Sequence, residues 1–256
     1  MQKYFDINES GYSIRCKLYC NDVHAIKKAV IFGHGFGGHK DNKAAEKFAA
    51  KLISKHREFC VVTFNWPCHG DDARKNLILG ECDTYLTTVI EYVKREFHTD
   101  EIYGYATSFG GYLFLKYIAE HKENPFRKLA IRCPAITIYD SMIHRIIPRD
   151  EYDKILKGKP VLAGFDRKIK ISKSFLEELK AADITQYDYM DYADDILIIH
   201  GTKDEIIPFD KSAEFADQNV IEFVPMTNGD HRFTDPKIMD LTIHTIIEFF
   251  ELADRR

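Results

Sequence analysis

Short apolar runs alternate with longer amphipathic segments along most of the chain. Five runs have the mostly apolar composition of strands buried on both faces of a sheet: residues 29–32, 59–64, 102–107, 129–131 and 196–199. From Cys82 to Phe97, apolar residues recur three and four positions apart, and this spacing predicts a helix with one apolar face. Because strands that alternate with helices form right-handed crossover units, the pattern predicts a three-layer α/β sandwich with a mostly parallel central sheet.

The ends of the chain extend this pattern. The segment Tyr12–Tyr19 precedes the alternation, and we expect it to add antiparallel strands at one edge of the sheet. Residues 220–224 are a further strand candidate, and apolar positions from Met239 to Phe250 predict a closing helix. Both ends are therefore expected to belong to the sheet domain.

One long segment, residues 138–194, has no convincing strand pattern. Long structureless loops are rare in compact domains, so an insertion of this length between two strands is typically a lid. We therefore expect a core formed by residues 1–137 and 195–256, with residues 138–194 inserted as a cap. The charge of the cap differs from that of the whole chain, because ten basic residues oppose six acidic ones between Ser141 and Lys180.

The composition excludes several classes of protein. With 256 residues and 45% hydrophobic side chains, the chain can bury a large core, so it is neither disordered nor a disulfide-stabilised miniprotein. No run approaches the roughly 20 apolar residues of a membrane span, and the first residues lack the apolar core of a secretion signal. A net charge of −4 argues against non-specific nucleic-acid binding. The six cysteines have no zinc-binding spacing, so we expect no bound metal. Because no secretion signal is evident, we expect these cysteines to be reduced thiols in a cytoplasmic protein.

The segment Ile102–Gly111 reads as a strand, a turn of small residues and a helix. Ser108 lies in the turn, with Ala106 two positions before it and Gly110 two positions after it. This A-x-S-x-G sequence is close to the G-x-S-x-G turn, in which small residues permit the sharp bend that exposes a nucleophilic serine. A serine that only caps the following helix is the alternative interpretation.

A glycine-rich segment, Gly33–Gly38, follows the first buried strand. Such a loop can direct backbone N–H groups toward a developing oxyanion, and acyl transfer needs two of these donors. Phe36 in this loop and Phe109 directly after Ser108 form the natural pair. A phosphate-binding loop is disfavoured, because neither the dinucleotide-binding glycine pattern with its acidic partner nor the P-loop pattern is present.

Two more polar residues follow predicted strands. Asp204 comes just after the strand at 196–199, and His231 lies in a turn after the last strand. A serine hydroxyl is a poor nucleophile until a base takes its proton, and that base needs a carboxylate to orient it. Along the chain these residues come in the order Ser108, Asp204, His231, which is the order of the three catalytic residues in one known α/β fold. Open α/β sheets also place their functional sites at the carboxyl ends of the strands.

Other acids and histidines compete for these roles. Glu205 and Asp210 are runner-up acids, whereas Asp230 is expected to be a turn residue. His34 and His200 each precede a glycine after a strand, and we interpret both as loop-packing residues.

Together these motifs resemble the α/β hydrolases, within the group of small capped serine esterases and lipases that includes cinnamoyl (feruloyl) esterases and monoacylglycerol lipases. The resemblance covers about residues 12–252. A further match is the segment Asn65–Asp71 with Asp72 directly after it. It is similar to the family's D-x-x-G-H-G-x-S loop but departs from it at Asn65, Cys68 and Asp72.

The resemblance implies a serine hydrolase that cleaves carboxylic esters of short-chain or hydroxycinnamoyl acids through an acyl-enzyme intermediate. Its catalytic residues would be Ser108, Asp204 and His231, its oxyanion hole would be Phe36 and Phe109, and it would need no cofactor. The expected partner is a small-molecule ester, and no feature of the sequence defines an oligomeric state. A solvated helical surface explains the basic cap most simply; a preference for anionic or phenolic acyl groups is the alternative.

Three rival functions use the same fold. A proline-releasing serine aminopeptidase would be expected to hold acidic residues in its cap, to bind a substrate's amino terminus, whereas this cap is basic. An acyl thioesterase would use the same residues as an esterase. A non-catalytic ligand receptor is disfavoured, because such proteins normally have an eroded triad.

Overall fold

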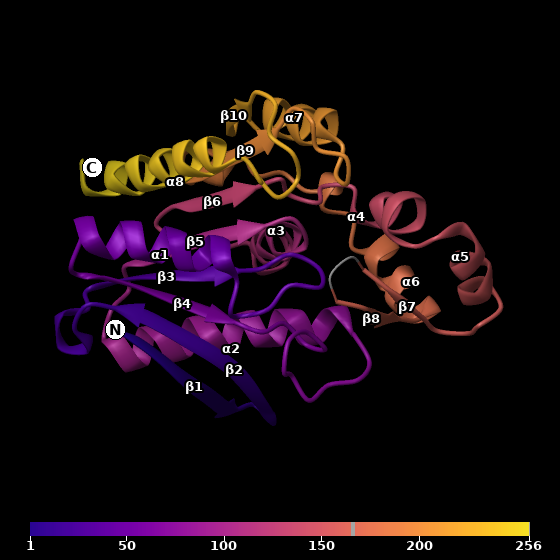
Figure 1. The fold of residues 1–256 in the computed structure, drawn as a ribbon, viewed down its shortest axis with the longest axis horizontal. Helices are drawn as coiled ribbons and strands as arrows, with labels where there is room; N and C mark the ends of the chain where they lie inside the picture. Colours follow the sequence, from indigo (N-terminus) through magenta and orange to yellow (C-terminus); the bar gives the residue numbers. More distant parts are fainter. Residues whose placement is uncertain (165–166, 256) are drawn as a thin grey trace.

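The computed structural model describes residues 1–164 and 167–255, with the last two of these described in backbone only. Its centre is an eight-stranded sheet with the strand order β1-β2-β4-β3-β5-β6-β9-β10 (Figure 1). Six strands of this sheet are mutually parallel: β4, β3, β5, β6, β9 and β10. At one edge, β2 runs antiparallel to both β4 and β1. The strands are β1 (Gln2–Glu9), β2 (Tyr12–Cys20), β3 (Lys28–Gly33), β4 (Phe59–Phe64), β5 (Ile102–Thr107), β6 (Leu129–Arg132), β9 (Ile196–Gly201) and β10 (Glu222–Met226).

Helices cover both faces of the sheet, as predicted for a three-layer α/β sandwich (Figure 1). Along β3, Val30 and Phe32 pack into the apolar cluster under α1 and α8, while Ala29 and Ile31 pack into the cluster on the other face. One face therefore holds α1 (Lys43–Lys55) and α8 (Pro236–Glu251), and the other holds α2 (Leu79–Phe97), α3 (Phe109–His121) and α7 (Phe209–Gln218). Short helical turns, η1 (Val23–Ala25) and η5 (Leu252–Arg255), complete this part.

The last strand begins two residues later than predicted. Val220 has a φ of +58° and is 73% exposed, so it forms a turn after α7 instead of starting β10. A β-branched residue in the left-handed region cannot continue a strand. The sequence prediction relied on the apolar residues at 220–224, and these do not show where the strand starts.

Residues 138–194 lie beyond the carboxyl ends of the parallel strands (Figure 1). The prediction that this segment contains no strand is wrong, because β7 (Val161–Ala163) and β8 (Ile169–Ile171) form an antiparallel pair. Each strand has only three residues, too few for an alternation to be recognised in the sequence. The remaining elements are α4 (Ile138–Ser141), the π-helical turn η2 (Met142–Ile146), α5 (Arg149–Leu156), α6 (Lys173–Ala181), η3 (Ile184–Gln186) and η4 (Met190–Asp195).

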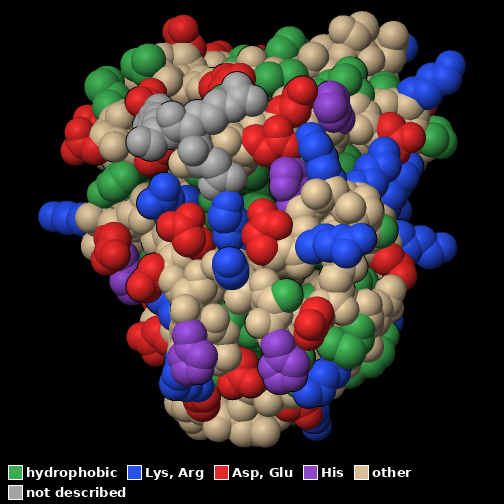
Figure 2. Space-filling view, turned by 90° about the vertical axis from the view of Figure 1, so that its left-hand side faces the viewer, with side chains coloured by type: hydrophobic (Ala, Val, Ile, Leu, Met, Phe, Trp, Pro, Cys, Tyr) green, Lys and Arg blue, Asp and Glu red, His purple; other side chains and the backbone are tan. Residues whose placement is uncertain are grey.

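Figure 2 shows the opposite side of the molecule, at the amino ends of the parallel strands. Acidic and basic side chains are interspersed over this face, and neither sign dominates it. All six cysteines belong to the described residues, and each is a free thiol. Among the residues that the structure describes, no helix combines the length and apolarity needed to cross a membrane.

Candidate active site

Ser108 occupies a strained turn between β5 and α3. Its φ of +52° and ψ of −116° lie outside the regions that L-residues prefer, which is the backbone expected of an exposed nucleophile. Its N–H donates to the carbonyl oxygen of Arg132 at 3.0 Å, which ties the turn to the end of β6. Within α3 and its flanking residues, all of them described, the Ser108 hydroxyl makes no capping hydrogen bond, so the structure does not use this serine as a helix cap.

Two glycines allow the backbone to approach the turn closely. A Cβ on Gly110 would lie 2.4 Å from the carbonyl oxygen of Gly33, so only glycine lets α3 start against the end of β3. A Cβ on Gly35 would lie 3.2 Å from the Cβ of Ser108. The glycine-rich loop after β3 therefore lies directly beside the serine, as the sequence predicted.

Asp204 and His231 come together at the carboxyl ends of β9 and β10. The Asp204 Oδ2 atom lies 2.7 Å from Nδ1 of His231, and Asp204 Oδ1 accepts hydrogen bonds from the N–H groups of Ile206 and Ile207 at 2.9 and 2.8 Å. The carboxylate has no exposed surface, whereas the imidazole is 11% exposed. With Nδ1 engaged, the other ring nitrogen of His231 is the one available for proton transfer.

The environment of Asp204 keeps its carboxylate ionised. Burial alone would raise the pKa of this carboxyl, but hydrogen bonds from His200 and His231 and the N–H of Ile207 outweigh burial. The pKa therefore lies well below its ordinary value of 3.8. A carboxylate that is ionised at neutral pH can orient a histidine and stabilise its charged form.

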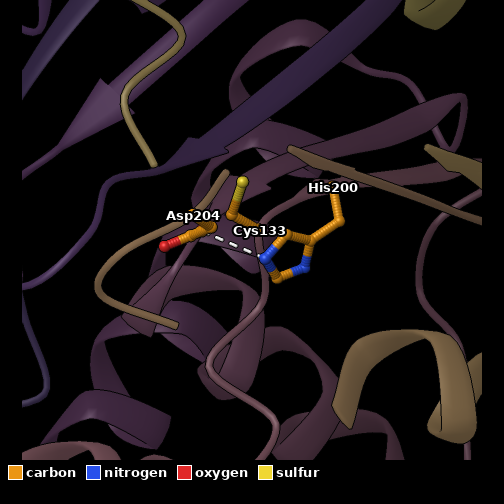
Figure 3. A group of neighbouring side chains, drawn as sticks. All are labelled: Cys133, His200 and Asp204. Carbon is orange, nitrogen blue, oxygen red and sulfur yellow. Dashed lines mark hydrogen bonds and ion pairs between the residues drawn. The ribbon is translucent and has the colours of Figure 1, made fainter. Parts of the chain in front are cut away.

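His200 also contacts Asp204, which the sequence did not reveal. Its Nε2 atom lies 3.0 Å from Oδ2 of Asp204 (Figure 3). His231 contacts the same oxygen. The ring is fully buried, and its Nδ1 atom has no hydrogen-bond partner among residues 1–164 and 167–255. The contact fits an imidazole that donates from Nε2. His200 belongs to β9 and not to a loop, so the interpretation of it as a loop-packing residue misses this contact.

Cys133, His200 and Asp204 form a group whose possible ligand atoms lie within 4.8 Å of one another (Figure 3). These residue types can bind a metal ion, but here the Asp204 oxygen already accepts from two imidazoles. Burial raises the pKa of the Cys133 thiol well above its ordinary value, so the thiol stays protonated. The group fits a packed support for Asp204 better than a metal centre.

Hydrogen bonds fix the orientation of the glycine-rich loop. The carbonyl oxygen of Gly35 accepts from Nδ1 of His34 at 2.8 Å and from the N–H of Gly38 at 2.9 Å, while His34 Nε2 accepts from the N–H of Trp66. Because the peptide bond is trans, the N–H of Phe36 points away from that carbonyl. His34 therefore does more than pack: it sets the direction of a candidate oxyanion donor.

The segment Asn65–Asp71 packs against the same loop through the ring of His69. The ring of His69 lies 5.5 Å from that of Phe36 and stacks on that of Phe109 at 6.2 Å, centroid to centroid. Burial lowers the pKa of His69 to about 4, so this ring is neutral at pH 7. Asp72 accepts a hydrogen bond from the N–H of Cys68 at 2.8 Å and holds the turn closed.

A cavity of about 590 Å³ opens beside Ser108 and His231. Phe36, Ile146 and Ile206 are among its lining residues, so the loop after β3, the inserted segment and the loop after β9 all contribute to it. Another cavity, of about 610 Å³, lies elsewhere between Lys128 and Leu252 and contains neither a serine nor a histidine. Of these two cavities, only the one at Ser108 is lined by both a serine and a histidine.

The remaining candidates take other places. Glu205 and Asp210 are exposed, and Asp230 accepts a hydrogen bond from the N–H of Thr234 at 2.8 Å, as expected for a turn residue. Phe109 forms the first residue of α3, directly after Ser108. The structure thus groups Ser108, Asp204, His231, Phe36 and Phe109 in one region.

Comparison with known protein families identifies the family of this chain. The model of the family described as serine aminopeptidase, S33 (Hydrolase_4) matches residues 24–162, more than half of the chain. The chain belongs to this family. It is an α/β hydrolase, as its motifs suggested. No curated protein sequence matches this S33-family chain.

Several solved structures share the fold of this S33-family protein. Est1E from Butyrivibrio proteoclasticus, with ferulic acid bound, is 18% identical with a TM-score of 0.76, over 98% of this chain and 100% of that one. A soluble variant of monoglyceride lipase from Saccharomyces cerevisiae, in complex with a substrate analogue, is 13% identical with a TM-score of 0.72, over 98% and 95%. Mouse α/β hydrolase domain-containing protein 10 is 17% identical with a TM-score of 0.73, over 97% and 98%. At these identities the likeness establishes the fold.

Proposed function

We propose that this hydrolase cleaves carboxylic esters, with Ser108 as the nucleophile, His231 as the general base and Asp204 as the residue that orients it. The observation that supports this proposal most is that His231, held by Asp204 at 2.7 Å, lines the same cavity as Ser108. The strained backbone of Ser108 and the absence of a capping bond in the described α3 region agree with it. The names of Est1E and monoglyceride lipase favour esters as the substrate class.

The proposed reaction has two stages. His231 takes the proton of the Ser108 hydroxyl, and the oxygen bonds to the ester carbonyl carbon, whose oxygen becomes an anion facing the N–H groups of Phe36 and Phe109. When the carbon–oxygen bond of the leaving group breaks, His231 gives its proton to the departing alcohol. Water then loses a proton to His231, attacks the acyl-enzyme and releases the acid, and Ser108 recovers its proton.

We also propose that residues 138–194 act as a cap over this cavity. Ile146 of η2 lines the cavity. A Cβ on Gly37 would lie 3.0 Å from the carbonyl oxygen of Arg167, so the β7–β8 region rests against the candidate oxyanion loop.

The six free thiols suit a reducing compartment, and we propose a cytoplasmic location.

The family name also raises peptide hydrolysis, which the cavity does not favour. An aminopeptidase needs a carboxylate that binds the substrate's charged amino group. Among the described residues no aspartate or glutamate lines the cavity at Ser108, whereas Lys43, Lys47, Arg132 and Arg232 do. An ester, or a thioester of the same acid, suits this lining better.

A single variant tests the nucleophile. Ser108→Ala should reduce kcat/KM for p-nitrophenyl butyrate by about 10⁴-fold or more while the thermal unfolding temperature stays within a few degrees. Ser54→Ala, at an exposed serine on α1, is the matched control and should keep the wild-type rate. If Ser108→Ala retains the wild-type rate, the assignment of Ser108 is wrong. An acyl-CoA and a proline-naphthylamide, run beside the ester, separate thioesterase and aminopeptidase activity.

A further inference from the structure

Arg132 is a buried cation beside the candidate nucleophile. It is the last residue of β6, it is 7% exposed, and its carbonyl oxygen accepts the N–H of Ser108 at 3.0 Å. Arg132 is one of the residues that line the same cavity as Ser108 and His231. A charge in this position is costly to bury unless an opposite charge or several hydrogen bonds compensate it.

The contacts of Arg132 do not compensate its charge. Its Nη1 atom donates to the carbonyl oxygen of Arg232 at 3.1 Å and lies 3.9 Å from the sulfur of Met239, and the guanidinium stands 5.2 Å from the ring centroid of Phe233. Its Nε atom is buried and has no hydrogen-bond partner in the part of the chain that the structure describes. None of these contacts is with a carboxylate, so the positive charge of the guanidinium has no anionic partner among the described residues.

The rest of the cavity reinforces this positive charge. Lys43 and Lys47 line it with Arg132, and no aspartate or glutamate does so among the described residues. The N-terminus of the 13-residue helix α1 also lies on this wall, where Asn42 caps it and the helix dipole is positive. Lys47 already pairs with Asp240 at 2.9 Å, so Arg132 is the cation whose burial most needs an anion.

We propose that Arg132 forms a carboxylate subsite, and that the substrates are esters with a second, anionic carboxylate, such as half-esters of short dicarboxylic acids. This inference rests on the proposed esterase function. The planar guanidinium can form two parallel hydrogen bonds with a carboxylate, which gives both attraction and orientation. The carboxylate would replace the missing partner of Arg132 and hold the ester carbonyl near Ser108.

The first test measures a preference. We compare kcat/KM for mono-p-nitrophenyl glutarate with that for p-nitrophenyl butyrate, which lacks the charge. In Arg132→Gln, the kcat/KM for the glutarate ester divided by that for the butyrate ester should fall by about tenfold or more. In Arg132→Lys this ratio should fall by less, because lysine keeps the positive charge but lacks the planar guanidinium that forms two hydrogen bonds. The wild-type preference should also fall as the salt concentration rises. Arg57→Gln, at an exposed arginine outside the cavity, is the matched control and should leave the ratio unchanged.

The second test does not need turnover. Glutarate is titrated by calorimetry into Ser108→Ala and into the double variant Ser108→Ala/Arg132→Gln. We expect binding to the first protein and at least a tenfold weaker binding to the second. The succinate and adipate titrations then define the length that fits.

These two tests separate the subsite from the esterase itself. If neutral esters are hydrolysed and both esters lose the same factor in Arg132→Gln, Arg132 is only structural and the subsite is refuted. Equal binding of glutarate to both titrated proteins refutes it as well. If no ester is hydrolysed but glutarate binding depends on Arg132, the esterase proposal fails and the carboxylate site stands.

Discussion

Two histidines contact the same oxygen of Asp204, and their surroundings differ. His231 lies in the loop after β10, is 11% exposed and lines the cavity with Ser108. His200 lies on β9 and has no exposed surface, and one of its ring nitrogens has no hydrogen-bond partner among the described residues. One imidazole on Asp204 therefore lies at the cavity, and the other lies in the protein interior.

The difference indicates a division of roles around one carboxylate. A group that exchanges protons with a substrate must reach the cavity, and only His231 does so among the two imidazoles. His200 instead completes a set of four donors on Asp204, together with His231 and the N–H groups of Ile206 and Ile207. We interpret His200 as a positioning residue, which acts only through Asp204.

The largest expected effect separates the two histidines directly. His231→Ala should lower kcat/KM for p-nitrophenyl butyrate by about 10⁴-fold or more, because the hydroxyl of Ser108 loses its base. His244→Ala, at an exposed histidine of α8, serves as the control and should hydrolyse the ester at the wild-type rate. An His231→Ala enzyme that remains within tenfold of wild type would contradict the comparison.

A nearly equal loss is expected when the shared carboxylate is neutralised. Asp204→Asn should lower kcat by about 10³ to 10⁴-fold, because the amide favours the wrong tautomer of His231 and cannot stabilise its charge. Glu205→Gln changes the neighbouring exposed acid in the same way and should have no effect beyond about twofold. Steady-state rates of both variants decide whether Asp204 or its neighbour is the acid.

The intermediate effect tests the buried histidine. His200→Leu removes one charge-assisted donor from Asp204, and we expect a loss of about 10- to 100-fold in kcat with little change in KM. His200→Gln can place a nitrogen donor where Nε2 stands and should recover most of that loss. If the glutamine variant is as slow as the leucine variant, His200 packs the site without holding Asp204.

The smallest effect concerns stability at acid pH. The pKa of Asp204 is lowered in the folded protein despite its burial, because His200 and His231 donate to it. Its stabilising contribution is therefore complete above the pKa of an unfolded aspartate and is lost as the pH falls below about 4. Urea denaturation should show the stability gap between wild type and Asp204→Asn shrinking from pH 6 to pH 3. A gap that is independent of pH would contradict the shift.

Much of this arrangement could be predicted from the sequence, because the motifs are local. Ser108 follows an apolar strand within a few residues, and Asp204 and His231 follow two others, so a parallel sheet brings all three to one edge. The contact of His200 could not be predicted. Every residue of β9 is buried, so no alternation shows which face a side chain takes.

The carbonyl oxygen of Gly201 accepts the N–H of Asp204 at 3.2 Å, and this turn folds the acid back toward His200. Neither the turn nor the unpaired charge of Arg132 has a signature in the sequence, because both depend on contacts between separate strands and loops. For the same reason the β7–β8 pair escaped prediction: its three-residue strands are defined by pairing and not by periodicity.

The most direct test of the proposed site is covalent labelling with a fluorophosphonate, which reacts with serines that an adjacent base activates. Mass spectrometry of the digested wild-type protein should show one adduct per chain, on the peptide that contains Ser108. His231→Ala should label far more slowly, His200→Gln nearly as fast as wild type, and Ser108→Ala not at all. An adduct on another serine, or none on a folded wild-type protein, would contradict the assignment of Ser108 and His231.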